Sequence, residues 1–135
     1  MLCDTGPLVA LVLRTDEYHS RAVEFVRACV NVQFITTWSC FTEAMYMVGR
    51  SGGWTAQDAL FRMVEQEVLD IHESRTADSE RMKELMSKYR DAPMDFADAS
   101  LISAAENLDE ATIFTFDSHF RFYLLNDQTP VNVVP

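Results

Sequence analysis

Short apolar segments alternate with segments of helical periodicity along the whole chain, and this alternation is the strongest constraint on the fold. Five segments read as strands: residues 1–3, 32–36, 68–71, 111–116 and 131–134. Parallel strands need long crossover connections, which are usually helices. The alternation therefore predicts an α/β fold with a central, mainly parallel sheet of about five strands, flanked by helices on both faces.

Helices are expected in the connections, because apolar residues recur there at helical spacing. Residues 50–53, Arg-Ser-Gly-Gly, predict a loop between two helices, and Pro93 is expected to end the connection before the last helix. The first expected helix has Pro7 as its first residue, and the second begins near Thr15 or Asp16. The third follows a cap at Thr37 or Ser39 and ends at about Gly49, and the fourth begins at Thr55 with Asp58. The fifth runs from Thr76 to Tyr89, and the last follows a cap at Asp95 and ends at about Leu108.

The 135 residues show no repeat, low-complexity tract or linker, which predicts a single domain over residues 1–135. Three cysteines without a Cys-x-x-Cys pair favour a reducing compartment. The chain shows no signal peptide, and no apolar run approaches the roughly 20 residues of a membrane helix. We therefore expect a cytoplasmic protein without a membrane partner.

The charge balance restricts the classes of partner. Eleven Lys and Arg residues against 21 Asp and Glu residues give a net charge of −10. Such a surface does not attract nucleic acid through bulk charge, but it suits metal ions or a basic protein. The motifs G-x-S-x-G, G-x-x-x-x-G-K-[ST], G-x-G-x-x-G and H-E-x-x-H are absent, which argues against the enzyme classes that they mark.

Two aspartates follow predicted strands. Asp4 comes directly after residues 1–3, and Asp117 comes directly after residues 111–116. Ligands of open α/β sheets bind at the carboxyl ends of the strands, so both side chains are candidates for a functional site.

Two further acids lie on helices with few polar residues. Glu43 is flanked by Tyr46 and Met47 on the side opposite an apolar stripe, so its helix reads as apolar nearly all round and buried. Asp98 is the only acid in the first turns of the segment 96–108. A carboxylate on a buried helix is costly unless another group compensates its charge.

A divalent cation would compensate all four acids if they meet. Converging carboxylates repel one another and take up protons, whereas hard oxygen ligands select Mg²⁺ or Mn²⁺. Each acid also has a simpler interpretation. Asp98 can close a capping box with Asp95, Glu43 can pair with Arg50, and Asp117 can be a turn residue. Solvated ion pairs are likewise the simpler interpretation for Arg14, Arg90 and Arg121.

The chain resembles the PIN-domain family of metal-dependent ribonucleases, in particular the VapC-like toxins of bacterial toxin–antitoxin pairs. The resemblance covers nearly the whole chain and lies in four segments, in order: MLCDTGPLVALV, ITTWSCFTEAMYMV, DAPMDFADASLISAAE and TIFTFDSHFRFY. The family's acids fall on Asp4, Glu43, Asp98 and Asp117.

The resemblance implies an acidic pocket that holds one or two Mg²⁺ or Mn²⁺ ions and hydrolyses RNA with a metal-activated water. Asp4, Asp98 and Asp117 would be metal ligands, and Glu43 would be a ligand or orient the attacking water. Thr115 and Thr5 would hold a carboxylate or a water. It also implies a homodimer and a basic antitoxin partner. Two alternatives remain: a PIN nuclease of RNA processing or turnover without an antitoxin, and a catalytically inactive module that binds RNA or protein.

Overall fold

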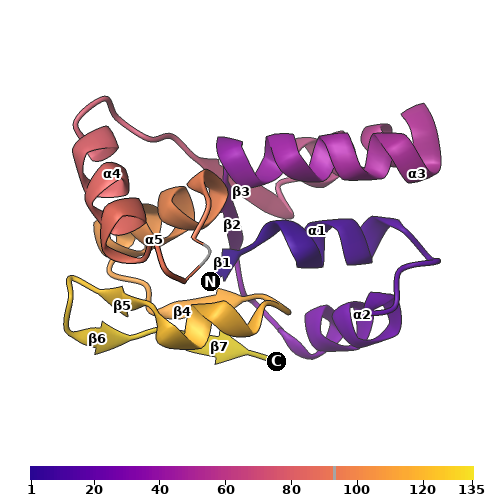
Figure 1. Ribbon diagram of the computed structural model, residues 1–135. Helices are drawn as coiled ribbons and strands as arrows, with labels where there is room; N and C mark the ends of the chain where they lie inside the picture. The colour runs from indigo at the N-terminus through magenta and orange to yellow at the C-terminus, as the bar shows by residue number, and fades with distance from the viewer. Residues whose placement is uncertain (93) are drawn as a thin grey trace.

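Five parallel strands form the central sheet in the computed structural model, which describes residues 1–92 and 94–135 (Figure 1). The strand order is β3-β2-β1-β4-β7, with β1 in the middle. The strands are β1 (Leu2–Cys3), β2 (Phe34–Thr37), β3 (Leu69–His72), β4 (Thr112–Phe114) and β7 (Asn132–Val134). The predicted parallel sheet of about five strands is confirmed.

Helices cover both faces of this sheet, as the sequence predicts. They are α1 (Thr5–Val12), α2 (His19–Ala28), α3 (Trp38–Glu65), α4 (Asp78–Lys88) and α5 (Phe96–Leu108). Figure 1 shows α1, α2 and α3 on one side of the sheet, and α4 and α5 on the other. The carboxyl ends of all five strands lie at the same edge of the sheet, because the strands are parallel.

Each face of the sheet carries its own apolar core. Neighbouring residues of β4 point to opposite faces, so Phe114 packs with Leu8 and Leu60 while Ile113 packs with Leu101 and α5. All five of these side chains are fully buried. A site built at the end of β4 therefore rests on elements that are fixed from both sides.

Two helices begin at other residues than the sequence predicts. The first begins at Thr5, so Pro7 is its third residue; the Asp4 carboxylate caps it by accepting the Thr5 N–H at 2.7 Å. The second begins at His19, not near Thr15 or Asp16. The Asp16 side chain accepts the Tyr18 N–H at 2.9 Å and so holds a turn ahead of the helix.

The two helices that the sequence predicts on either side of residues 50–53 are present, but the four-residue loop between them is not. Residues Trp38–Glu65 form two helices that join at Gly53, where φ is 61° and ψ is −156°. The chain reverses there, because Gln57 Nε2 donates to the Met45 main-chain oxygen at 3.2 Å and the rings of Phe41 and Phe61 lie 5.9 Å apart. This backbone conformation is accessible to glycine, which explains how a single residue breaks the helix. The predicted cap at Thr37 is confirmed, because its hydroxyl accepts the Cys40 N–H at 3.3 Å.

The prediction that the helix around Glu43 is buried all round is also wrong. One stripe, with Phe41, Ala44 and Val48, is buried, but Tyr46 is 63% exposed and Met47 is 43% exposed. Only the buried stripe packs on the sheet and on α1, which leaves apolar side chains on the outer side of α3.

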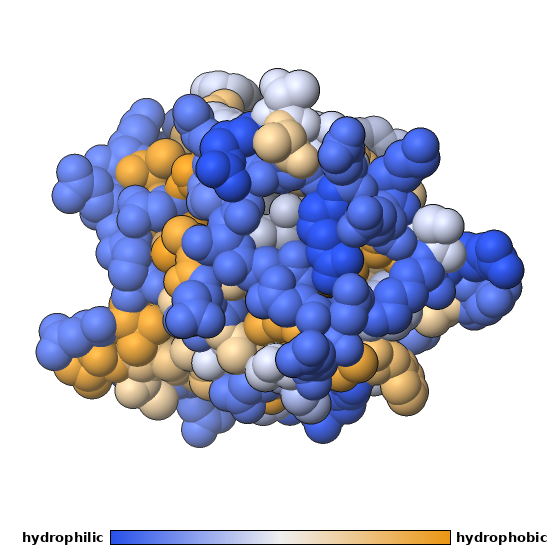
Figure 2. Space-filling view, turned by 90° about the vertical axis from the view of Figure 1, so that its left-hand side faces the viewer, coloured by the Kyte–Doolittle hydropathy of each residue, from blue (hydrophilic) through white to orange (hydrophobic). Residues whose placement is uncertain are grey.

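The C-terminal part contains elements that the sequence did not reveal. These are the 3₁₀ helix η1 (Ser118–Phe122) and an antiparallel pair of β5 (Leu124–Leu125) and β6 (Thr129–Pro130). Arg81 of α4 binds Glu106 of α5 through two hydrogen bonds of 2.8 and 2.9 Å and also reaches Asp127 of the β5–β6 turn. The face that these elements form is mostly hydrophilic (Figure 2).

The boundaries of the remaining helices agree with the sequence-based predictions within a few residues. Pro93, which was expected to end the connection before the last helix, lies outside the described residues. No helix in the described part is both long enough and apolar enough to span a membrane.

We expect Gly53→Ala to destabilise the fold by about 1–3 kcal/mol, because a Cβ is strained at this backbone conformation. No atom of a more distant residue lies within 4 Å of the place that the new Cβ would take, so the cost is conformational and not a clash. Urea unfolding followed by circular dichroism measures it. The control is Gly6→Ala in α1, which also meets no atom and is expected to be neutral or stabilising by up to about 1 kcal/mol. Equal stability of the two variants would contradict this interpretation of the junction at Gly53.

Candidate functional site

Four acids from four separate elements face one region at the carboxyl edge of the sheet. Asp4 ends β1, Glu43 lies on α3, Asp98 lies on α5 and Asp117 follows β4. Their charges act on one another: Asp117 and Glu43 act on the carboxyl of Asp4, and Asp4 and Asp117 act on that of Asp98. The structure thus brings together all four acids that the sequence singled out.

Asp4 lies at the centre of the cluster and is 7% exposed. Its Oδ1 accepts the Thr5 N–H at 2.7 Å, and its Oδ2 accepts the Thr115 hydroxyl at 2.7 Å. Both carboxylate oxygens are therefore oriented by groups of neighbouring elements, with lone pairs left for a further ligand.

Two threonine hydroxyls link the other acids to this centre. The Thr115 Oγ1 accepts the Asp117 N–H at 2.9 Å, so it connects the segment after β4 with Asp4. The Thr5 Oγ1 donates to Glu43 Oε2 at 2.8 Å, which holds the Glu43 side chain toward α1. Glu43 does not pair with Arg50, which donates instead to the Tyr46 hydroxyl at 3.0 Å.

Asp98 shares a capping box with Asp95. Asp95 Oδ1 accepts the Asp98 N–H at 2.9 Å, and Asp98 Oδ2 accepts the Asp95 N–H at 3.4 Å. The prediction that Asp95 caps the helix is confirmed. The Tyr123 hydroxyl also donates to Asp98 Oδ2, at 3.3 Å. Sequence reasoning missed Tyr123, since only the folded chain places it beside α5.

Asp117 is more open than the other aspartates, with 41% of its side chain exposed. Its Oδ1 accepts the His119 N–H at 2.8 Å and lies 2.8 Å from His119 Nδ1. Asp117 is thus the cap of η1, in keeping with its simpler interpretation as a turn residue. In this position the negative charge of Asp117 still acts on the carboxyl groups of Asp4 and Asp98.

Burial, together with the crowding of acids, raises the pKa values of two carboxyl groups. Burial raises the pKa of Asp4 to about 6; the hydrogen bonds from Thr115 and Thr5 oppose the shift, and the charges of Asp117 and Glu43 add to it. Burial, then the charges of Asp95 and Asp4, raise the pKa of Asp98 to about 7. The cluster is therefore short of compensating positive charge at neutral pH.

Within residues 1–92 and 94–135, His119 is the one basic side chain at ion-pair distance from these acids, and it is charged only when protonated. No Lys or Arg forms an ion pair with any of the four acids in this part of the chain. Nor do three His, Cys, Asp or Glu side chains in the described residues already stand in a metal-binding arrangement. The donor set itself, carboxylates with threonine hydroxyls, fits a hard divalent cation such as Mg²⁺ or Mn²⁺.

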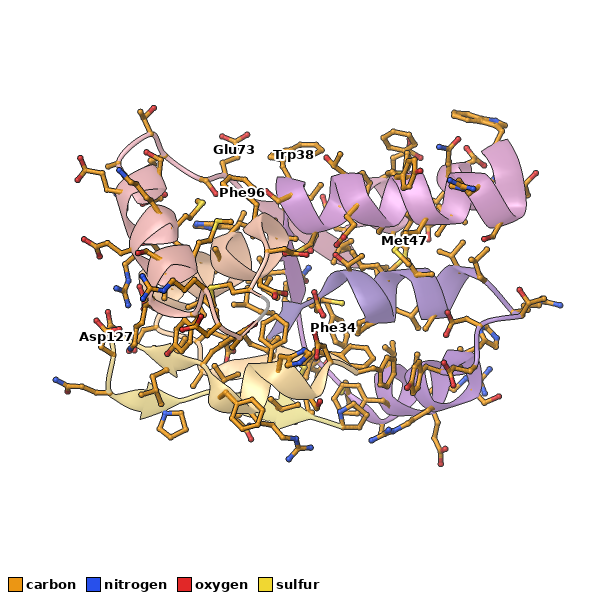
Figure 3. The ribbon with its side chains drawn as sticks, in the orientation of Figure 1. Phe34, Trp38, Met47, Glu73, Phe96 and Asp127 are labelled. Carbon is orange, nitrogen blue, oxygen red and sulfur yellow. The ribbon has the colours of Figure 1, made fainter. Side chains whose placement is uncertain are left out.

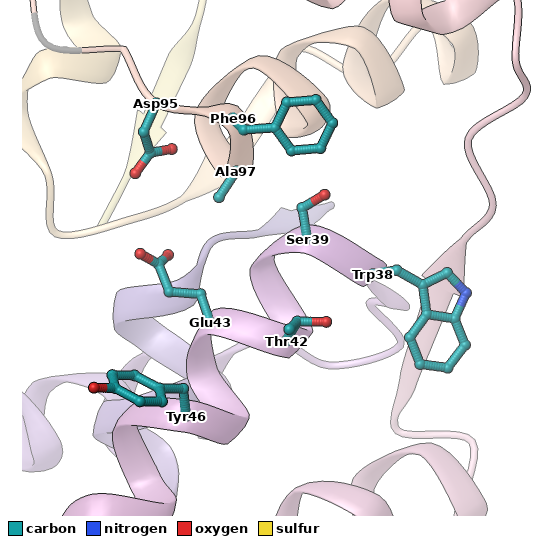
Figure 4. A pocket seen from close by; sticks show the side chains of 8 residues that line it. All are labelled: Trp38, Ser39, Thr42, Glu43, Tyr46, Asp95, Phe96 and Ala97. Carbon is teal, nitrogen blue, oxygen red and sulfur yellow. The ribbon is translucent and has the colours of Figure 1, made fainter.

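A hollow of about 730 Å³ adjoins the cluster on the side of Glu43 (Figure 4). Three of its lining side chains are exposed aromatic rings: Trp38 is 52%, Tyr46 is 63% and Phe96 is 55% exposed. Trp38 and Phe96 stand near each other where α3 and α5 begin (Figure 3). Flat apolar faces next to carboxylates suit a ligand with both rings and charged groups, such as a nucleotide chain.

Comparisons with known proteins agree with this geometry. The PIN domain family model matches residues 1–123. Comparison with curated protein sequences gives no match. Among solved structures, the chain is similar to VapC20 of Mycobacterium tuberculosis, described as a Sarcin-Ricin loop cleaving toxin. The TM-score is 0.79 at 18% identity, over 86% of this chain and 88% of that chain. This likeness confirms the predicted fold.

We expect the metal-free fold to become more stable as the pH falls from about 8 to 5. The folded-state pKa values of Asp4 and Asp98 lie above the unfolded value of about 3.9, so the penalty for their charged forms is full above pH 7 and is relieved as they take up protons. Thermal unfolding in EDTA measures this. Asp98→Asn is expected to reduce the pH dependence by up to a few kcal/mol, because one pKa unit corresponds to about 1.4 kcal/mol.

The matched control is Asp91→Asn, which makes the same charge change at a side chain that is 95% exposed. It is expected to retain the pH dependence of the wild type. If Asp98→Asn and Asp91→Asn respond to pH alike, the pKa of Asp98 is not raised in the folded state.

Proposed function

This chain belongs to the PIN domain family, and on that basis we propose that it is a metal-dependent endoribonuclease, the toxin of a toxin–antitoxin pair. The observation that carries the proposal is the cluster of four carboxylates from four elements, with no Lys or Arg paired to them in the described residues. A divalent cation in this cluster would compensate the negative charge of the carboxylates.

Asp4, Asp98 and Asp117 are the proposed metal ligands, directly or through water, and Glu43 is a ligand or orients the attacking water. A bound Mg²⁺ or Mn²⁺ ion would lower the pKa of a bound water and neutralise charge on the phosphoryl oxygen. Asp4 is already oriented by Thr5 and Thr115. Glu43 stands at the border between the cluster and the aromatic hollow.

The threonines act as positioning residues in this proposal. Thr115 bridges the Asp4 carboxylate and the Asp117 main chain, so its hydroxyl sets the relative placement of two ligands. Thr5 does the same for Glu43. Hydrogen bonds of this kind fix the orientation of metal ligands, and their removal typically lowers metal affinity or activity about 10–100-fold.

RNA is the proposed substrate because the aromatic hollow lies beside the carboxylates. Proteins recognise unpaired RNA bases by stacking them on aromatic rings, and Trp38, Tyr46 and Phe96 offer exposed rings. The similar toxin VapC20 is described as cleaving the Sarcin-Ricin loop, and only the class of reaction is carried over to this chain. Hydrolysis is proposed to leave a 5′-phosphate and a 3′-hydroxyl.

A basic antitoxin, a homodimer and a cytoplasmic location complete the proposal. The net charge of −10 favours a basic protein partner. A PIN nuclease of RNA processing or turnover would lack the antitoxin, and a module that only binds RNA or protein would lack the metal.

We expect end-labelled structured RNAs to be cut by the wild type with Mg²⁺ or Mn²⁺ and not in EDTA. Asp98→Asn should lose about 100-fold or more of this activity, since even groups that only support metal ligands contribute about 10–100-fold. Asp91→Asn, which makes the same charge change at an exposed position, should cut like the wild type. Gel electrophoresis of the products measures the rates.

Equal cutting by Asp98→Asn and the wild type would show that the activity is a contaminant's or that the site is elsewhere. If no RNA is cut, titration calorimetry with Mn²⁺ decides between the remaining possibilities. Failure to bind the ion would favour the binding-only module.

The assembly is tested by mass and by co-purification. Light scattering should give about 31 kDa for the isolated protein, twice the 15.4 kDa of the chain. Purification from the native host should bring down a small basic protein. A nuclease without an antitoxin would purify alone, and a mass near that of the single chain would contradict the homodimer.

A further inference from the structure

Two arginines that are far apart in the sequence line one small cavity beside the carboxylate cluster. Arg21 comes from α2, and Arg121 comes from η1. The cavity measures about 80 Å³, and Thr115 and Asp117 also line it. It therefore shares a wall with the candidate site.

Arg21 is held in place by a main-chain oxygen and an aromatic ring. Its Nη2 donates to the main-chain oxygen of Pro135 at 3.0 Å. Its guanidinium lies over the Phe116 ring, 5.5 Å from the centroid, and Phe116 in turn stacks on Tyr18 with centroids 4.5 Å apart. Cation–π contact of this kind orients the planar guanidinium and leaves its other N–H groups free to donate.

Neither arginine forms an ion pair in the part of the chain that the structure describes. Elsewhere acidic partners are taken up by Arg62, Arg75, Arg81, Lys88 and Arg90. The expectation that Arg121 joins a solvated ion pair is therefore wrong for the described residues. Arg14, Arg27, Arg50 and Lys83 likewise form no ion pair in the described residues. What distinguishes Arg21 and Arg121 is their place on a cavity that Thr115 and Asp117 of the candidate site also line.

Asp117 is the acid that lines the cavity with them. Its Oδ1 accepts the His119 N–H, and its charge acts on Asp4 and Asp98. The cavity is thus lined by arginines from α2 and η1 and lies directly beside the carboxylate cluster.

We propose that Arg21 and Arg121 bind a backbone phosphate of the RNA that flanks the bond to be cut. The proposal rests on the proposed ribonuclease function. Guanidinium groups match the geometry of phosphate oxygens and form strong, charge-assisted hydrogen bonds with them. A protein of net charge −10 cannot hold RNA by bulk attraction, so a local cationic site near the carboxylates is what the substrate requires.

The two residues act on binding and not on the chemical step. A flanking phosphate carries the same charge before and during the reaction, so its contacts strengthen ground state and transition state alike. Loss of either arginine is therefore expected to raise KM and leave kcat unchanged. The effect should not depend on RNA sequence, because every nucleotide presents the same phosphate.

The test measures binding of a fluorescein-labelled single-stranded RNA by anisotropy in EDTA, at salt concentrations between about 50 and 200 mM. The variants are Arg21→Gln, Arg121→Gln and both together. Each single variant should weaken binding about 10-fold, and the double variant should reduce the slope of log K against log salt by about 0.7, the value for one phosphate contact on a single strand. Arg21→Lys should keep most of the salt slope, because the charge remains.

The matched control is Lys83→Gln on α4, an exposed cation without an ion pair in the described residues. It should leave affinity and slope unchanged. KM and kcat are measured in parallel with Mn²⁺, and unfolding temperatures confirm that all variants fold.

The outcomes separate this inference from the proposed function. If the wild type cuts RNA but the arginine variants behave like Lys83→Gln, the phosphate site is wrong and the ribonuclease stands. If the wild type binds RNA with the expected dependence on both arginines but never cuts it, the phosphate site stands and the hydrolysis is wrong. If the wild type binds no RNA in EDTA, the measurement with Mn²⁺ decides, and arginine variants with the KM of the wild type would overturn the phosphate site. Arginine variants that change only the mass of the assembly would also overturn it.

Discussion

The rest of the site depends on one buried carboxylate, that of Asp4. It ends the central strand β1, caps α1 through the Thr5 N–H, and accepts the Thr115 hydroxyl from the segment after β4. The Asp4 side chain therefore fixes the relative positions of three elements. Because Thr115 also binds Asp117 and Thr5 also binds Glu43, the placement of two more acids follows from that of Asp4.

The energies show that these acids do not serve the fold alone. A helix cap such as the Asp95–Asp98 box contributes about 1 kcal/mol. Raising the pKa of Asp98 to about 7 corresponds to an electrostatic cost of a few kcal/mol at high pH, since each unit is about 1.4 kcal/mol. The cost exceeds the benefit of the cap. A neutral cap residue would therefore stabilise the metal-free fold better, which agrees with the proposal that a cation compensates the acid.

The sequence predicted what depends on local pattern. Alternating segments predicted the parallel sheet, and the acids that follow strands were expected at its carboxyl edge because parallel strands end together. The sequence misled where tertiary packing decides. Residues 50–53 read as a loop, whereas two helices join directly at Gly53, and the side of α3 with Tyr46 is exposed although its composition reads as buried. The contact of Tyr123 with Asp98 joins segments 25 residues apart and has no local signal.

The distribution of charge explains how an acidic chain can engage a polyanion. Most of the surface repels RNA, and the carboxylate cluster repels it most until a cation occupies it. Attraction must then come from features that flank the cluster: aromatic rings on the side of Glu43, which stack with bases regardless of charge, and two unpaired guanidinium groups on the side of Asp117. An RNA that places its bases on the aromatic rings and a phosphate at the arginines would be favoured over other RNAs. The phosphates of an RNA that binds in another position would lie next to acids and be repelled. For the proposed ribonuclease, the net charge of −10 would therefore contribute to selectivity among RNAs.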